Sequence, residues 1–288
     1  MQVGSKPSIR QMQLSDLSQA MQLANIEGWN QCETDWKILL ENHSNICLVA
    51  EINGEIVGTA TALNHSDELA WIGMVLVNKS FRGQGIGKSL MLSIIGDLKN
   101  FRSVKLDATQ AGLPVYQKLG FVEERIIYRM TNSSFQNFKE KKSEIIPELI
   151  LQKDFDEIVK FDKPIFGVNR KVLLESIYRN YPLKGFIDKK NNEITGYILG
   201  RDGIRYNYIG PLLAINLMHA KALLSVALKN LENKSVCLDV FEDKAELIEW
   251  LESVGFIKQR QFVRMFLKNN LYTGIIKNNY LLSGPEFG

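Results

Sequence analysis

The sequence has 288 residues, of which 45% are hydrophobic and 23% are charged, and its formal net charge is +3. This length suits one large or two ordinary domains, the composition is that of a globular protein, and so small a charge gives no argument for a nucleic-acid or anionic membrane partner. Three widely spaced cysteines without a metal-ligand pattern, and an N-terminus without the apolar core of a signal peptide, predict a cytoplasmic protein without a metal.

The elements predicted for the first half mix helices and strands. Residues 9–26 have apolar side chains at helical spacing with Asp16 as the candidate N-cap, and residues 36–40 belong to a second helix. A tight Asn53-Gly54 turn then joins two strands. The later elements are strands at 46–52, 55–63, 69–77, 103–109 and 121–130 and helices at 89–98 and 114–119. This order predicts an α+β fold with a mostly antiparallel sheet.

A glycine-rich turn joins the strand at residues 69–77 to the helix that follows it: Arg82-Gly83-Gln84-Gly85-Ile86-Gly87-Lys88. Glycines let the backbone turn tightly, and the start of a helix offers free N–H groups and a positive dipole end to an anion. A Walker-type loop would need glycine in place of Arg82, and a dinucleotide fingerprint would need glycine in place of Lys88. The pattern [QR]-x-x-G-x-[GA] fits residues 82–87 fully. In this turn the chain resembles the GNAT superfamily of N-acetyltransferases, whose members bind the pyrophosphate of acetyl-CoA with it.

The resemblance implies roles for residues of the first half. Backbone groups of a splayed strand would bind the pantetheine arm and the turn would hold the pyrophosphate, with charge added by Arg82 and Lys88. The cofactor-binding residues implied are Val75, Leu76, Val77, Arg82, Gly83, Gln84, Gly85, Ile86, Gly87, Lys88 and Thr109. Tyr116, spaced before Gly120-Phe121 as in the family, would donate a proton or a hydrogen bond to the departing thiolate. The alternative for Tyr116 is a ring packed in the core.

The acceptor side of the cleft is expected near the first two helices. Trp29, Asn30, Asp35 and Trp36 lie where GNAT members often bind their amine, although a loop and a core tryptophan are the alternative. Asp107 and Glu27 are the candidates for a general base, and either could equally be structural.

The second half looks like a weak copy of the first. Four short segments recur in the same order at an offset of about 135 residues. They are Ile56-Val57-Gly58 with Ile194-Thr195-Gly196, Val104-Lys105-Leu106-Asp107 with Val236-Cys237-Leu238-Asp239, Leu119-Gly120-Phe121 with Val254-Gly255-Phe256, and Arg129-Met130 with Arg264-Met265. Because Asp107 recurs as Asp239, a structural role is favoured for it. The repeat predicts two GNAT-like domains in tandem, each a mixed, mostly antiparallel central sheet flanked by helices.

The copies differ at the glycine turn. Its counterpart, residues 212–220, contains no glycine, and Tyr116 corresponds to Leu251, which cannot donate a proton. We therefore expect a catalytic domain at residues 1–132, a polar linker at 133–145 and a degenerate domain at 146–288. The segments Phe166-Gly167-Val168-Asn169-Arg170 and Ile209-Gly210-Pro211-Leu212 are similar to a bacterial GNAT group with such a C-terminal domain.

The resemblance implies an N-acetyltransferase that moves an acetyl group from acetyl-CoA to a primary amine, with no metal. Small amines, amino acids, aminoglycosides and protein N-termini are all candidate acceptors. The alternative is a non-catalytic acyl-CoA sensor or scaffold that keeps the fold.

Overall fold

The computed structural model describes residues 6–136 and 144–288, so part of the predicted linker lies outside the described residues. The strands are β1 (Ser8–Gln11), β2 (Ile46–Ile52), β3 (Glu55–His65), β4 (Leu69–Val77), β5 (Ser103–Thr109), β6 (Val122–Asn132), β7 (Glu148–Leu149), β8 (Phe186–Lys190), β9 (Glu193–Arg201), β10 (Asn207–Ala214), β11 (Val236–Phe241), β12 (Ile257–Lys268) and β13 (Asn279–Leu281). The helices are α1 (Leu17–Ile26), α2 (Glu33–Glu41), α3 (Ile86–Asp97), α4 (Leu113–Lys118), α5 (Phe155–Phe166), α6 (Lys171–Asn180), α7 (Leu217–Lys229) and α8 (Ala245–Ser253). None of these helices is long and apolar enough to cross a membrane.

The strands predicted at 46–52, 69–77 and 103–109 have the bounds of β2, β4 and β5. The candidate N-cap Asp16 does directly precede α1. The apolar pattern noted from Ile9 extends too far back, because residues 8–11 form β1 at the sheet edge beside β2. The Asp16 carboxylate accepts the backbone N–H of Gln13 at 2.8 Å and two hydrogen bonds from Arg10. Asp16 therefore closes the short turn between β1 and α1, and the helix begins one residue after it.

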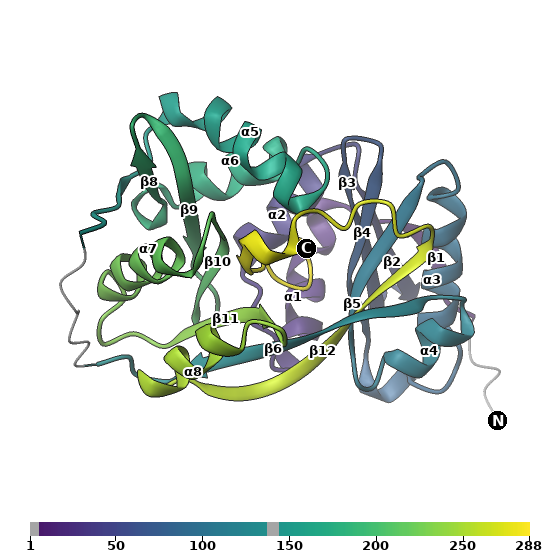
Figure 1. Ribbon diagram of the computed structural model, residues 1–288. Helices are drawn as coiled ribbons and strands as arrows, with labels where there is room; N and C mark the ends of the chain where they lie inside the picture. The colour runs from purple at the N-terminus through teal and green to yellow at the C-terminus, as the bar shows by residue number, and fades with distance from the viewer. Residues whose placement is uncertain (1–5, 137–143) are drawn as a thin grey trace.

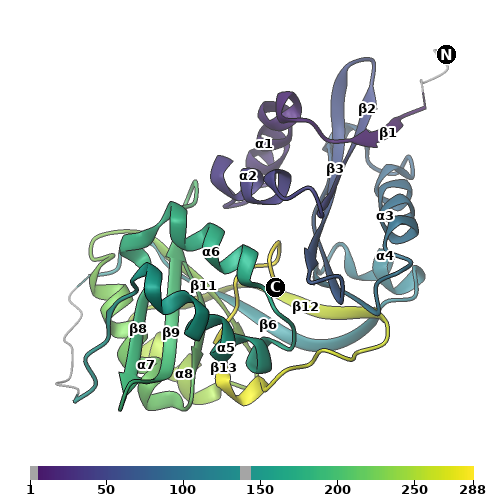
Figure 2. The same ribbon diagram turned by 90° about the horizontal axis from the view of Figure 1, so that it is seen from above.

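All strands join in one sheet whose order is β1-β2-β3-β4-β5-β12-β6-β11-β10-β9-β8-β7, with β13 beside β10. Neighbouring strands are antiparallel except for the pairs β4–β5 and β10–β11, which confirms the predicted mixed, mostly antiparallel sheet. Figure 1 and Figure 2 show helices on both sides of each half and two long strands, β6 and β12, that run between the halves.

The long strands β6 and β12 each pair with a strand of the other half. β12 pairs with β5 of the first half, and β6 pairs with β11 of the second. The boundary predicted at residue 132 coincides with the end of β6, whose neighbours β11 and β12 both belong to the second half. Each half therefore pairs with the strand that corresponds to its own last long strand, and the two halves share one sheet.

Two buried ion pairs join β12 to β5 and β6 to β11. Arg264 of β12 donates two hydrogen bonds to Asp107 of β5, at 2.9 and 3.0 Å. Arg129 of β6 does the same to Asp239 of β11, at 2.8 and 2.7 Å. These four residues are the repeated aspartates and arginines of the sequence. The repeated residues therefore form the same Arg–Asp ion pair twice, once from β12 to β5 and once from β6 to β11.

Candidate active site

β4 and β5 separate in the middle of the sheet. They pair from Leu69–Ser103 to Ile72–Leu106, whereas β4 stays paired with β3 as far as Val77. The register between β3 and β4 shifts near Met74, which has φ +51° and whose carbonyl accepts the Thr59 hydroxyl at 2.7 Å. Within the described residues, no strand pairs with residues 73–77 on the side of β5. This edge, which includes Val75, Leu76 and Val77, is open to an extended ligand.

The glycine turn lies at the end of that open edge. Within the described residues, none of the backbone N–H groups from Gly83 to Lys88 donates a hydrogen bond. Gly83 and Gly85 both have φ +80°, a conformation that side chains with a Cβ rarely adopt. Ile86, the first residue of α3, is buried and anchors the turn. The turn therefore presents a row of free donors and the positive end of a helix to one place, which suits a pyrophosphate.

Arg82, predicted to add charge beside the turn, already has two partners within the chain. Its Nε donates to the Val77 carbonyl at 3.0 Å, and its Nη2 lies 2.6 Å from Oε1 of Glu27. Lys79 is 3.8 Å from the same oxygen. Glu27 is consequently paired with Arg82 and lies near Lys79, while Lys88 is exposed and has no ion pair within the described residues.

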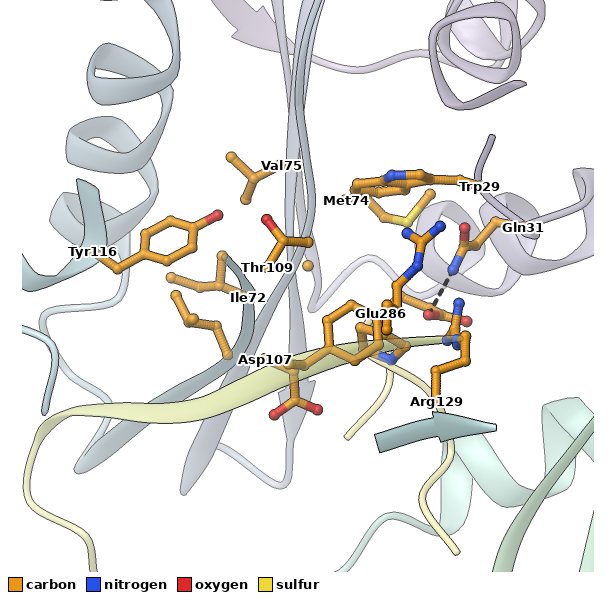
Figure 3. Close-up of a pocket in the computed structure, with 15 residues that line it drawn as sticks. Trp29, Gln31, Ile72, Met74, Val75, Asp107, Thr109, Tyr116, Arg129 and Glu286 are labelled. Carbon is orange, nitrogen blue, oxygen red and sulfur yellow. Dashed lines mark hydrogen bonds between the residues drawn. The ribbon is translucent and has the colours of Figure 1, made fainter. Parts of the chain in front are cut away.

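Tyr116 reaches the gap between β4 and β5 from α4. Its ring packs edge-on against Phe121, and its hydroxyl points toward Thr109 and Val75 (Figure 3). Within the described residues the hydroxyl has no hydrogen-bond partner, and burial raises the pKa of the phenol to about 12. A Cβ added to Gly112 would lie 2.8 Å from Cε2 of this ring, so glycine is needed there to seat it.

The pocket in front of Tyr116, which we call the central pocket, is lined from both halves of the chain. Its lining residues are Trp29, Gln31, Ile72, Gly73, Met74, Val75, Leu106, Asp107, Thr109, Tyr116, Arg129, Arg260, Phe262, Pro285 and Glu286. Asp107 borders it, but Figure 3 shows its carboxylate directed away from the Tyr116 hydroxyl. Because Arg264 holds that carboxylate, Asp107 is a structural residue.

Of the four residues predicted on the acceptor side, Trp29 lines the central pocket. The predicted role of Trp36 is wrong, because its side chain is fully buried in the core beneath α2. Asp35 is also buried, and its Oδ1 lies 2.9 Å from Nε of Arg201. Asn30 uses its amide to hold the loop before β10, accepting the N–H groups of residues 205 and 206 at 3.0 and 2.8 Å. Asn30 positions that loop and lies outside the central pocket.

The equivalent gap in the second half is filled by the chain itself. β10 pairs with β11 only at Asn207 and Tyr208, after which β13 pairs with β10 at Leu212 and Leu213. The turn before α7 is short, and the Asn216 side chain accepts the N–H of His219 at 3.2 Å. Within the described residues, β13 thus covers the strand edge that corresponds to the open edge of β4, and the Asn216 side chain caps the turn before α7.

Two family models match the chain, and both describe acetyltransferases. The model of the "Acetyltransferase (GNAT) family" matches residues 11–121, and that of the "Acetyltransferase (GNAT) domain" matches residues 158–278. The chain belongs to the GNAT superfamily. It carries two GNAT domains in tandem, as the repeat predicted.

Relatives of this GNAT chain match most of its length. Holothin acyltransferase from Pseudoalteromonas sp. (strain SANK 73390) is 27% identical over 219 residues, which is 75% of this chain and 72% of that protein. The uncharacterized N-acetyltransferase YitH from Bacillus subtilis (strain 168) is 24% identical over 199 residues, 69% of this chain and 70% of the relative.

Solved structures share the fold at low identity. One from Pyrococcus horikoshii has a TM-score of 0.82 at 20% identity, covering 99% of this chain and 96% of the other. A tandem GNAT protein from the clavulanic acid biosynthesis pathway has a TM-score of 0.65 at 12% identity, covering 91% and 98%. The tandem arrangement as a whole is thus shared.

Several residues that line the central pocket could not be predicted from the sequence, because they belong to segments that are far apart in the chain. Arg129, Arg260 and Phe262 come from β6 and β12, and only Arg129 had a signal, as a repeated anchor. Glu286 comes from the C-terminal tail. Its Oε2 accepts a hydrogen bond from Nε2 of Gln31 at 2.8 Å, and its Oε1 accepts one from Arg201. No pattern in the sequence connects residue 286 with β4.

Proposed function

We propose that the protein transfers an acetyl group from acetyl-CoA to a primary amine in the central pocket. The observation that carries this proposal is the coincidence of three features in one half of the chain. One gap in the sheet is bordered by all three: the open edge of β4, the free N–H groups of residues 83–88, and the unpartnered Tyr116 hydroxyl. The second half, with the same fold, has none of the three.

The first half has groups suited to hold each part of the co-substrate. Backbone groups of residues 73–77 would bond the pantetheine arm as an added strand, and the N–H groups of residues 83–88 would hold the pyrophosphate. Lys88 would add a positive charge beside it. Thr109 borders the gap near Tyr116, although its Oγ1 already accepts the N–H of Gly112 at 3.2 Å.

In the reaction, a neutral amine nitrogen attacks the thioester carbonyl carbon. A C–N bond forms and the C–S bond breaks, the nitrogen loses one proton, and the sulfur leaves with the electron pair. The Tyr116 hydroxyl would donate to that sulfur, because it faces the gap and has no competing partner. Trp29 and the residues from β6, β12 and the tail would enclose a small-molecule or peptide acceptor.

A non-catalytic acyl-CoA sensor is the competing function, because the second half shows that this fold can persist without the site. The two are separated by incubating the full chain with labelled acetyl-CoA and a panel of amines, and by measuring acetylated product and free thiol. Product formed in proportion to enzyme and time supports the transferase. Tight acetyl-CoA binding without product from any amine would favour the sensor.

A further inference from the structure

A second depression adjoins the central pocket on the side away from Tyr116. It is lined by Gly28, Asn30, Arg129, Arg205, Tyr206, Gln259 and Arg260. We call it the arginine pocket, because three of its lining residues are arginines and none is an acid. Arg129 and Arg260 line both pockets, so the two adjoin there. Figure 3 shows Tyr116 and Arg129 at opposite ends of the central pocket.

Arg260 lies beside a second guanidinium group and has no acidic partner among the described residues. In the register of β12 and β6 it lies directly opposite Arg129, and like charges in such a cross-strand pair are destabilising. Arg129 is neutralised by its two hydrogen bonds to Asp239. Arg260 has no ion pair within the described residues, and partial burial, followed by the Arg129 charge, lowers its pKa. Its side chain is exposed, so a ligand from solution can reach it. A bound anion would offset the repulsion between the two guanidinium groups.

Arg205 is held near them by the loop that Asn30 fixes. Besides accepting the N–H groups of residues 205 and 206, Asn30 donates to the Tyr206 carbonyl at 3.0 Å. The Arg205 guanidinium donates only to uncharged oxygens, the carbonyl and side-chain oxygens of Asn25, both at 3.3 Å. The register shift in β12 leaves Gln259 as an extra residue that contacts the Tyr206 hydroxyl at 3.4 Å. The Arg205 guanidinium thus lies at the arginine pocket without an acidic partner among the described residues.

We propose that the arginine pocket binds a carboxylate or phosphate group of the acceptor, so that the preferred substrates are amines that carry a negative charge. The inference rests on the proposed function, because it takes the acetyl group to be delivered near Tyr116. An acceptor whose amine lies in the central pocket would then extend its anionic end toward Arg260 and Arg205. Guanidinium groups suit both anions, since their planar donors match pairs of oxygens.

The test compares matched amines with wild-type protein. Glycine is compared with glycinamide, and glucosamine 6-phosphate with glucosamine. Each rate is expressed per concentration of neutral amine, because an anionic group also raises the pKa of a nearby ammonium. We expect kcat/KM to be at least about tenfold higher for the charged member of one pair or both, as for other charge-assisted contacts. The pair that shows the preference tells whether carboxylate or phosphate is the natural group.

Variants then assign the preference to the pocket. Arg205→Gln, which lies outside the central pocket, should remove most of the preference while leaving the rate with the neutral member nearly unchanged. Arg260→Gln should also remove most of the preference. Lys258→Gln is the matched control, because Lys258 lies on the same strand, is exposed and lines neither pocket. Equal rates for charged and neutral amines in the wild type, or a preference that survives both arginine substitutions, would overturn the proposal.

A binding measurement separates this inference from the proposed function. Inorganic phosphate and N-acetylglycine are titrated into the full chain saturated with CoA, so that the glycine turn is already filled. Binding of either probe that is lost in Arg260→Gln and kept in Lys258→Gln supports the anion site even if no amine is acetylated. If neither probe binds, the anion site is refuted, whatever the acetylation assay shows.

Discussion

Replacing Tyr116 with phenylalanine removes only the hydroxyl and keeps the ring that packs on Phe121. Burial raises the pKa of this phenol to about 12. A thiol has an ordinary pKa of about 8.5, so complete proton transfer from the phenol to the thiolate would be uphill by about 5 kcal/mol in the free enzyme. The expected contribution of Tyr116 is therefore a hydrogen bond to the developing thiolate rather than a fully transferred proton.

A hydrogen bond to a charged group contributes about 1.5–3 kcal/mol, which corresponds to a loss of about 10- to 150-fold in kcat for Tyr116→Phe. The affinity for acetyl-CoA should change little, because backbone groups provide most of the binding surface. Single-turnover measurements of thiol release, with calorimetry for affinity, give the two quantities separately.

The pH profile provides a second readout. Because a phenol with a pKa near 12 stays protonated, the wild-type rate should show no loss from tyrosine ionisation up to about pH 10. The reasoning would be refuted by an unchanged kcat in Tyr116→Phe. It would also be refuted by a basic limb between about pH 8 and 10 that disappears in this variant.

Three further substitutions test the geometry. Gly112→Ala should lower kcat as much as Tyr116→Phe does, because its Cβ would displace that ring; a wild-type rate would show that the ring position is not required. Gly85→Val should weaken CoA binding at least about tenfold in calorimetry, because valine is strained at φ +80°, whereas unchanged affinity would sink the assignment of the turn. Asp107→Ala should destabilise the protein to urea by about 3–5 kcal/mol by leaving Arg264 buried and unpaired. Asp107→Ala/Arg264→Met should recover much of that loss, and a double variant no more stable than the single one would contradict the ion-pair explanation.

The sequence was informative wherever chemistry depends on a local pattern. The glycine turn, the strand before it and Tyr116 with its Gly120-Phe121 spacing could all be placed, because each lies within a short continuous segment. Trp36 could have been assigned to the core from its spacing to buried Leu39 on the same helix face.

The pairing of β6 and β12 across the two halves could not be predicted, and the reason is physical. β6 and β12 carry the same Arg-Met pair at the same place, so β5 and β11 each meet equivalent side chains from either strand. A local pattern therefore does not distinguish a half's own strand from its copy. The residues that line the acceptor side of the pocket depend on that choice, which is why Arg260 and Phe262 were missed.

β13 has a consequence for how many ligands one chain can take up. A segment attached to its own binding groove competes at an effective concentration that is typically millimolar, well above what a free molecule usually reaches. The carbonyl of Leu282, just after β13, would lie 2.0 Å from a Cβ at Gly210, and the N–H of Leu282 donates to β11 at 3.0 Å. The tail thus occupies, in the second half, the strand edge that corresponds to the open edge of β4. A titration with CoA should reach saturation at one equivalent per chain, although the chain contains the fold twice.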